Sequence, residues 1–478
     1  MTVSATTFEP PCLIGGADEH GENRLEVVYP FTGEIIGTAP VLSRSTVRRA
    51  LDLAGAAIVS LDRYARSLVL EGVAAMIAGE AGELASLITR ESGLCLADTT
   101  HEVARAVDVF RFAARAALRD DGELWACDIS PNGRARRAFT TREPVRLVAA
   151  ITPFNHPLNQ VAHKFAPAIA AGAPIVLKPS EKTPLAALWL ARAVLEAGYP
   201  PDALAVVTGD RKEILNEMLG HEAVEVVMFT GGIAVGELIA SRAGYRRTVL
   251  ELGGNDPLIV LADAELDEAA ELAVAGGTRN SGQRCTAVKR ILAEAPVAEE
   301  LAARIAVGAG RLVVGDPLDP ATDVGTLIDE EAAGRVEVRV SGAIADGARL
   351  LGGGERSGAQ IVPPVLEQVR PVSELVREET FGPALPVTSV ADLDEAIAVA
   401  NGTRYGLSAG VVSNDLVAIT RCIRELRCGT VNIREVPGFR TEETPFGGVK
   451  ASGLGAKEGV VESIRAMTTV KVATLPWP

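Results

Sequence analysis

The sequence predicts an α/β protein in which helices alternate with the strands of a mainly parallel, doubly wound sheet. From Val145 onward, short β-branched runs alternate with stretches of helical periodicity, which is the pattern of βαβ units. Polar or glycine-rich turns directly follow four of these runs, as the ligand crevice of such a sheet requires. The composition, with 47% hydrophobic and 23% charged residues, is that of a globular chain, and 478 residues suffice for about three domains.

The residues before this alternating region are expected to form helices followed by an exposed hairpin. Between Ser45 and about Leu118, apolar residues such as Val69 and Val73 return every three or four positions, and Ser45 is a candidate N-cap. The basic, alternating stretch 132–142 fits neither a helix nor a buried strand. We expect a solvent-facing hairpin there, which is a candidate oligomerisation arm.

The alternating region divides into two series. In the first, strands are expected at 146–152, 174–177, 204–207, 224–229 and 248–251, and helices up to about 171, at 185–197 and from about 233. The second series begins after Gly254 and runs to about 431. Within it we expect a helix at 266–275, a strand at 290–294 and a helix at 393–400.

Charge and composition exclude several classes of function. The net charge of −15 argues against nucleic-acid binding, since phosphate contacts need a basic surface, so an anionic ligand must meet a local group of cations. The uncharged runs are broken by proline and amide residues, which predicts no membrane span, and no basic flank precedes an apolar stretch at the start. A cytoplasmic location is therefore expected. Six scattered cysteines and five histidines predict neither a disulfide framework nor a metal site.

The four turns at predicted strand ends contain the first candidate functional residues. They are Thr152-Pro153-Phe154-Asn155-His156, Lys178-Pro179-Ser180-Glu181, Phe229-Thr230-Gly231-Gly232 with Gly236, and Glu251-Leu252-Gly253-Gly254-Asn255. Because the carboxyl ends of parallel strands meet at one edge of a sheet, a nucleotide could bind across these turns. The glycine-rich turn alone is a weak signal, since it lacks the full dinucleotide fingerprint, although a phosphate could bind at the helix N-terminus there.

Cys285 is the candidate nucleophile. It follows glycine and polar residues, and we expect it to open a helix, where free backbone N–H groups would hold an oxyanion and lower the thiol pKa. A packed, inert cysteine is the commoner state of an isolated thiol, and Glu251 could equally be a buried strand residue. Because 34 residues separate the two positions, only the fold can bring them together.

Seven motifs, taken in order, resemble those of the NAD(P)-dependent aldehyde dehydrogenases. They are Pro153-Phe-Asn155, Lys178-Pro-Ser-Glu181, Phe229-Thr-Gly-Gly232, Glu251-Leu-Gly-Gly-Asn255, Gly282-Gln-Arg-Cys285, Glu379-Thr-Phe381-Gly-Pro and Pro445-Phe-Gly-Gly448. The resemblance covers the whole chain and implies that family's fold. It implies a Rossmann-like cofactor domain (1–119 and 143–252), an α/β catalytic domain with the nucleophile (253–430) and a small β arm (120–142 and 460–478) that joins a homodimer or homotetramer.

The resemblance also implies roles for individual residues. Cys285, as thiolate, would attack the aldehyde carbon to give a thiohemiacetal, and its backbone N–H and the Asn155 amide would hold the oxyanion. After hydride loss, Glu251 would activate the water that hydrolyses the thioester. The implied cofactor contacts are Thr152, Pro153, Phe154, Lys178, Ser180, Glu181, Thr230, Gly231, Gly232, Gly236, Leu252, Glu379 and Phe381.

The cofactor is expected to be NAD rather than NADP. A Glu181 carboxylate that accepts a hydrogen bond from the ribose 2′-OH would repel a 2′-phosphate. The adjacent Lys182 would soften that preference.

The substrate is expected to be a small anionic aldehyde. By resemblance, Arg105, His156, Arg284, Arg440 and the nearby Arg434 border the aldehyde tunnel. Cationic side chains there suit a dianionic head group, because guanidinium binds phosphate-like oxygens bidentately. Each arginine taken singly could instead belong to a surface ion pair, given 62 acidic residues in the chain.

Four stretches, 151–163, 241–247, 281–290 and 435–440, resemble phosphonoacetaldehyde dehydrogenases, which implies oxidation of phosphonoacetaldehyde to phosphonoacetate. Arg434 departs from this pattern, since an aromatic residue is expected there, and it leaves phosphonoformaldehyde open as a substrate. Non-phosphorylating glyceraldehyde-3-phosphate dehydrogenase and a general aldehyde dehydrogenase are further alternatives. A cofactor-independent thiol esterase is the alternative from another class. A non-catalytic protein is disfavoured because Cys285, Glu251 and Asn155 are all present.

Overall fold

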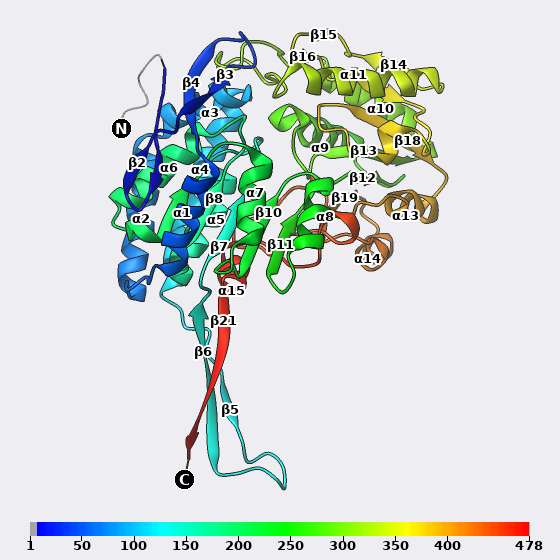
Figure 1. The fold of residues 1–478 in the computed structure, drawn as a ribbon. Coiled ribbons are helices and arrows are strands. Elements are labelled where there is room, and N and C mark those ends of the chain that lie inside the picture. Colours follow the sequence, from blue (N-terminus) through cyan, green and yellow to red (C-terminus); the bar gives the residue numbers. More distant parts are fainter. Residues whose placement is uncertain (1–6, 478) are drawn as a thin grey trace.

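Two seven-stranded sheets and a slender arm organise the chain, of which the computed structural model describes residues 7–477 (Figure 1). In the first sheet, with the order β11-β10-β7-β8-β9-β1-β2, neighbouring strands from β11 to β9 are parallel, and β1 pairs antiparallel with both β9 and β2. Its strands are β1 (Cys12–Ile14), β2 (Ala17–Glu19), β7 (Val148–Ile151), β8 (Ile175–Lys178), β9 (Leu204–Val206), β10 (Val226–Thr230) and β11 (Arg247–Glu251).

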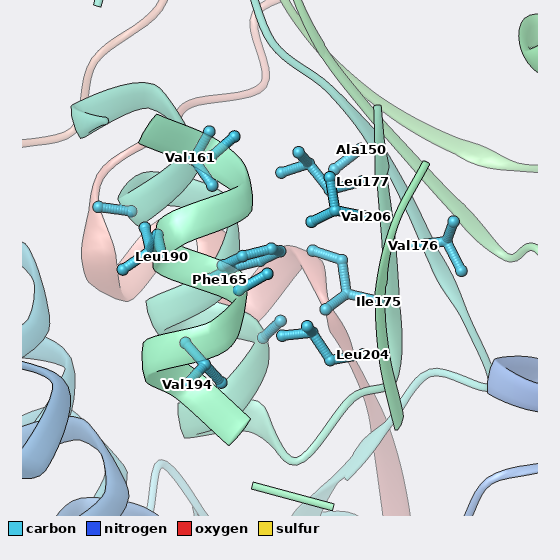
Figure 2. Close-up of a cluster of buried hydrophobic side chains, with 14 of the residues drawn as sticks. Ala150, Val161, Phe165, Ile175, Val176, Leu177, Leu190, Val194, Leu204 and Val206 are labelled. Atoms are coloured by element: carbon cyan, nitrogen blue, oxygen red, sulfur yellow. The ribbon is translucent and has the colours of Figure 1, made fainter. Parts of the chain in front are cut away.

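Both faces of this sheet carry apolar side chains. In β8, Ile175 and Leu177 point toward α5 (Asn159–Ala171) and α6 (Leu185–Glu196), whereas Val176 points to the opposite face (Figure 2). All three side chains are buried. A parallel strand buried on both faces has a continuous apolar sequence, which explains why the strands of this region lack an apolar–polar alternation.

Among the described residues, four helices lie before the parallel strands. They are α1 (Arg44–Ala56), α2 (Arg63–Gly79), α3 (Ala81–Ser92) and α4 (Leu96–Ala117), and a hairpin of β3 (Asn23–Val28) and β4 (Ile35–Val41) precedes them. The expectation that Ser45 caps the first helix is wrong. Ser43 has the extended backbone of an N-cap and its Oγ accepts a hydrogen bond from the Thr46 N–H at 3.2 Å, whereas Ser45 lies inside the first turn.

The second sheet has the strand order β14-β17-β18-β13-β12-β19-β20 and is parallel from β17 to β20. Its strands are β12 (Asp256–Val260), β13 (Val288–Glu294), β14 (Arg349–Gly352), β17 (Val365–Glu367), β18 (Leu385–Val390), β19 (Ser408–Val412) and β20 (Thr430–Ile433). Two further helices, α7 (Arg211–Gly220) and α8 (Ile233–Arg242), alternate with strands of the first sheet. The helices that alternate with strands of the second sheet are α9 (Leu266–Thr278), α10 (Ala295–Ala309), α11 (Glu330–Ala345), α12 (Glu374–Arg377), α13 (Leu393–Asn401) and α14 (Leu416–Glu425). A small hairpin joins β15 (Arg356–Ser357) to β16 (Gln360–Ile361).

A three-stranded arm extends away from the body of the molecule (Figure 1). It consists of β5 (Leu124–Ala126), β6 (Arg136–Pro144) and β21 (Thr468–Pro476), and β21 pairs antiparallel with β6 along its whole length. The preceding helix α15 (Val460–Ala466) packs against α5 in the body, so only the strand of this C-terminal segment belongs to the arm. The arm exposes Trp125, Ile129, Val472 and Trp477, among other apolar side chains.

Candidate active site

A cavity of about 370 Å³ lies at the carboxyl ends of the first sheet's parallel strands. Residues that follow β7, β8, β10 and β11 form one side, and residues near the second sheet close it. Its lining includes Thr152, Pro153, Phe154, Asn155, His156, Lys178, Ser180, Glu181, Thr230, Gly231, Gly232, Glu251, Leu252, Cys285, Glu379 and Phe381. The fold thus brings the three predicted catalytic residues and most of the predicted cofactor contacts to one cavity.

Cys285 does not open a helix, and that expectation is wrong. It lies in a turn between the short 3₁₀ segment Arg279–Gly282 and β13. Asn280 and Ser281 both have left-handed backbone, with φ of 53° and 51°, and this conformation ends the helical path before the cysteine. The nucleophile therefore receives no lowering of its pKa from a helix N-terminus.

The thiol pKa of Cys285 is raised to about 12. Burial is the main cause, and the carboxyl groups of Asp256 and Glu379 add to it, whereas Arg284 and Arg440 oppose the rise. The thiol is consequently protonated at neutral pH, and a base must remove its proton before it can attack.

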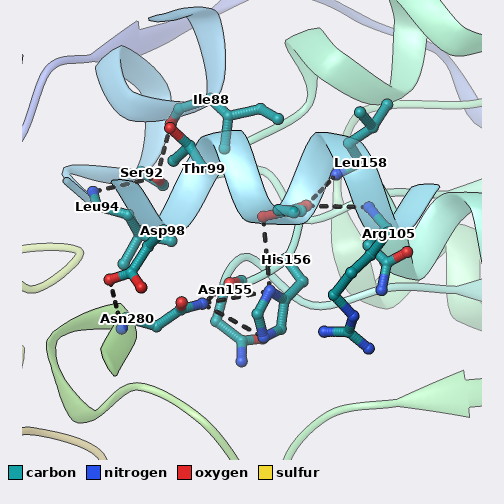
Figure 3. A network of polar contacts seen from close by, with 12 residues as sticks. Ile88, Ser92, Leu94, Asp98, Thr99, Arg105, Asn155, His156, Leu158 and Asn280 are labelled. Atoms are coloured by element: carbon teal, nitrogen blue, oxygen red, sulfur yellow. Dashed lines mark hydrogen bonds and ion pairs between the residues drawn. The ribbon is translucent and has the colours of Figure 1, made fainter. Parts of the chain in front are cut away.

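Asn155 is held between the nucleophile loop and α4. Its side-chain Nδ2 donates to the Gln283 backbone carbonyl at 2.7 Å. The backbone carbonyl of Asn155 accepts from Asn280 Nδ2 at 3.1 Å (Figure 3). The Asn280 N–H in turn donates to Asp98 on α4 at 2.7 Å. Because a side-chain amide has two N–H groups, Asn155 retains one for an oxyanion beside Cys285.

Glu251 ends β11 with both carboxyl oxygens buried and without a hydrogen-bond partner. It is 3% exposed, and burial raises its pKa to about 8 against the opposing charges of Lys164 and Arg440. Gly447 leaves room for it, since a Cβ there would approach Glu251 Oε1 to 2.5 Å. A buried carboxyl group with a raised pKa and no partner is suited to general-base work on a water.

Lys164 is a buried charge in this region that sequence reasoning missed. Its Nζ donates to Glu458 and, at 3.0 Å, to the Thr230 hydroxyl, and burial lowers its pKa to about 7. The available signal was a lysine directly before the apolar run 165–171 of helix α5, because a lysine so placed needs a buried partner.

The cavity residues fit a dinucleotide. At one end Lys178 Nζ lies 3.2 Å from Glu181 Oε2, which offers a polar pair to an adenosine ribose. Gly231 and Gly232 precede the N-terminus of α8, which favours a pyrophosphate. Thr152 Oγ1 is buried and lacks a partner at the cavity wall, as expected of an atom that a ligand would satisfy.

The remaining predicted cofactor residues lie as follows. Glu379 Oε1 accepts from the Gly254 N–H at 3.1 Å, and Phe381 packs edge-on to Phe154 with ring centroids 5.8 Å apart. Gly236 lies outside the cavity lining, and a Cβ there would collide with Leu252. Its role is close packing of α8 rather than ligand contact.

The four arginines predicted to bind the head group differ in their surroundings. Arg284 and Arg440 are half-buried and lie close enough to Cys285 to influence its pKa, and the Arg440 guanidinium lies 4.1 Å from the Phe446 ring centroid. Arg105 forms an ion pair with Glu442. The Arg434 side chain is 48% exposed and binds Glu268 and Asn414 at the surface, so the structure does not bring it to the site.

His156 lines the cavity, but its ring nitrogens contact protein groups. Nδ1 lies 3.5 Å from Glu102 Oε2, and Asn280 Nδ2 lies 3.2 Å from the same nitrogen (Figure 3). Glu102 Oε1 also accepts the N–H groups of Leu158 and Asn159 at the start of α5. Burial lowers the pKa of His156. The neutral ring therefore orders the turn beside Asn155.

The sequence model of the Aldehyde dehydrogenase family matches residues 17–473. The chain belongs to the aldehyde dehydrogenase family. The enzyme is 39% identical over 457 residues to aspartate-semialdehyde dehydrogenase 1 of Pseudomonas canavaninivorans, which covers 95% of this chain and 97% of that protein. It is 37% identical over 463 residues to 3-sulfolactaldehyde dehydrogenase of Priestia aryabhattai, with 97% of each chain covered.

The enzyme also resembles a solved structure, the NADP-dependent glyceraldehyde-3-phosphate dehydrogenase of Bacillus halodurans C-125 complexed with NADP. The TM-score is 0.96 at 34% identity, with 98% of this chain and 100% of that chain covered. The aldehyde dehydrogenase fold predicted from the sequence is thereby confirmed, as is an oxidoreductase that acts on aldehydes.

Other features of residues 7–477 complete the description. A groove of about 830 Å³ between α4, α9 and α10 contains none of the predicted site residues. No helix in these residues has the length and apolarity needed to cross a membrane. The described part of the chain also holds no group of three or more histidine, cysteine or acidic side chains that would bind a metal ion.

Proposed function

We propose that the enzyme oxidises a short aldehyde with an anionic head group, with phosphonoacetaldehyde as substrate, phosphonoacetate as product and NAD as cofactor. The observation that supports this most strongly is the pair of half-buried arginines, Arg284 and Arg440, whose positive charges lie close enough to Cys285 to lower its pKa. Such groups bind tetrahedral anions through paired, charge-assisted hydrogen bonds.

One of the two guanidinium groups has a buried donor without a partner. Arg440 Nη1 is buried and lacks a hydrogen-bond partner, and burial lowers the pKa of Arg284 to about 10. A buried cation without a partner costs free energy that an anionic ligand would offset. The names of the relatives agree with this chemistry, since aspartate semialdehyde, sulfolactaldehyde and glyceraldehyde 3-phosphate all carry an acidic group.

The chemistry follows from the cavity. Cys285, as thiolate after its proton passes to solvent, attacks the aldehyde carbon, and the resulting oxyanion accepts hydrogen bonds from the Cys285 backbone N–H and from Asn155. NAD, when bound, would supply the hydride acceptor, so that loss of hydride from the thiohemiacetal leaves a thioester. Glu251 then takes a proton from water, and the hydroxide attacks the thioester carbon. The acid is released as Glu251 returns that proton to the departing Cys285 sulfur.

The cofactor preference rests on Glu181. Its carboxylate lies 3.2 Å from Lys178 Nζ and 3.6 Å from Arg211 Nη1, so it can accept a ribose 2′-OH while adding negative charge that disfavours a 2′-phosphate. Arg211 and Lys182 offset part of that charge, which makes NADP a poor rather than a forbidden cofactor.

The arm is proposed to join subunits. Its exposed tryptophan, isoleucine and valine side chains lie on a long strand pair that extends beyond the body, and a homodimer or homotetramer would bury them.

Initial rates test the proposal, with NADH formation measured for phosphonoacetaldehyde, sulfoacetaldehyde, glyceraldehyde 3-phosphate and propanal, each with NAD and with NADP. We expect kcat/KM for phosphonoacetaldehyde with NAD to exceed that for propanal about a hundredfold, or roughly 2.7 kcal/mol of head-group recognition. If sulfoacetaldehyde ranks first, the substrate is a sulfonate bound by the same arginines. If propanal matches the anionic compounds, the head-group assignment is wrong, and ester hydrolysis that needs no cofactor would favour the esterase instead.

A further inference from the structure

We infer that Glu442 is a positioning residue that fixes Arg105 as the third cation of the head-group site, and that it thereby sets the affinity for anionic aldehydes. The inference rests on the proposed function and deepens it. Glu442 lies in the loop after β20, two residues beyond Arg440 and three before the Pro445-Phe-Gly-Gly448 motif.

The Glu442 carboxylate joins three separate parts of the chain. Its Oε1 accepts from Arg105 Nε at 2.5 Å and its Oε2 from Arg105 Nη2 at 3.3 Å, which holds one edge of the guanidinium on α4. Its Oε2 also lies 2.5 Å from His163 Nε2 on α5. Glu442 is 5% exposed, so water does not compete for these bonds.

This geometry leaves the other edge of Arg105 available. A guanidinium has five N–H groups, and Glu442 engages only those on the Nε edge, so Nη1 remains free to bind a ligand oxygen. Held in this way, Arg105 presents a fixed donor edge rather than a mobile side chain. Pre-organised donors bind an anion with less loss of side-chain entropy.

A counter-ion is needed because three guanidinium groups lie in this region. Arg105 lowers the pKa of both Arg284 and Arg440, which shows that the positive charges repel one another. Arg105 has a route to solvent, since its side chain is 19% exposed. Without a negative partner, repulsion would favour conformers in which Arg105 turns outward.

Glu442 remains charged as the partner of Arg105. Burial raises the pKa of Glu442, but the hydrogen bond from His163 and the charge of Arg105 outweigh it and hold this pKa far below its usual range. Burial lowers the pKa of His163 to about 4, so the ring is neutral and donates its Nε2 hydrogen. The negative charge of Glu442 is therefore the counter-ion of the arginines, since the neutral His163 carries no positive charge to cancel it.

Glu442→Gln tests the inference, because glutamine keeps the size and one carbonyl acceptor but removes the charge. We expect KM for phosphonoacetaldehyde to rise about 10- to 100-fold, while kcat and the kinetics of neutral propanal stay within about twofold. Glu443→Gln, at the exposed neighbouring position, is the matched control and should change neither substrate. Glu442→Asp, which keeps the charge, should recover part of the affinity.

A double-variant cycle shows whether Glu442 acts through Arg105. Arg105→Gln alone should also raise KM for phosphonoacetaldehyde and spare propanal, and adding Glu442→Gln to it should cause no further rise. The inference would be overturned if the two substitutions raised KM for phosphonoacetaldehyde independently, so that their factors multiplied in the double variant. It would also be overturned if Glu442→Gln lowered kcat/KM equally for phosphonoacetaldehyde and propanal. Arg105→Gln and Glu442→Asp provide the same test if Glu442→Gln does not fold. Failure of the proposed function looks different, since the wild-type enzyme would then not prefer phosphonoacetaldehyde to propanal at all.

Discussion

Two buried glutamates of the site, Glu251 and Glu442, differ in what surrounds their carboxyl groups. Glu251 has no hydrogen-bond partner, and burial raises its pKa to about 8. Glu442 is almost as buried, but Arg105 and His163 bind it and hold its pKa far below the usual range. The partners, rather than the residue type or the burial, decide whether a glutamate here accepts protons or supplies a permanent negative charge.

The largest effect that separates the two glutamates is expected from Glu251→Gln. Glutamine keeps the size of the side chain but cannot take a proton from water, so kcat should fall about 10²- to 10⁴-fold. If thioester hydrolysis is the step that fails, rapid mixing should show a burst of NADH close to one equivalent per active site, followed by slow turnover. Full loss of the burst would place the role of Glu251 before hydride transfer.

The pH dependence of kcat also separates Glu251 from Glu442. Because the pKa of Glu251 is raised to about 8, its base form is scarce at neutral pH, and kcat should increase as the pH rises through this value. The rise should be absent in Glu251→Gln and retained in Glu442→Gln, since Glu442 stays ionised across this range. An identical rise in Glu251→Gln would assign the titration to another group.

The smallest effect is expected from Arg434→Ala. Arg434 binds Glu268 on α9 at 2.8 Å and lies at the surface, where such ion pairs contribute about 0–1 kcal/mol to stability. KM for phosphonoacetaldehyde should therefore change by no more than about twofold. A tenfold increase in this KM would show that Arg434 does take part in head-group binding.

The sequence was sufficient to predict which strand-end turns line the cavity. Strand-end turns such as Thr152–Asn155 and Lys178–Glu181 are local features, and parallel strands align their carboxyl ends whatever the details of packing. The five parallel strands of the first sheet lie within a few residues of their predicted positions for the same reason, since continuous apolar runs mark strands covered on both faces. The edge strands β1 and β2 and the helix α7 were not predicted.

The rest depended on contacts that no local pattern shows. Glu442 is 337 residues from Arg105, so their ion pair emerges only from the fold. Cys285 was expected to open a helix, but the left-handed residues Asn280 and Ser281 end the helical path before it. Arg434 likewise points outward because it binds Glu268, and no local pattern connects these two residues.

The most direct test of the central claim is the ratio of kcat/KM for phosphonoacetaldehyde to that for propanal in wild type, Arg284→Met and Arg440→Met. The methionine variants keep much of the side-chain length and remove the guanidinium. We predict a ratio of about a hundred in wild type that falls about 10- to 100-fold in each variant, with propanal nearly unchanged. A wild-type ratio near one, or an equal loss of both substrates in the variants, would contradict the account.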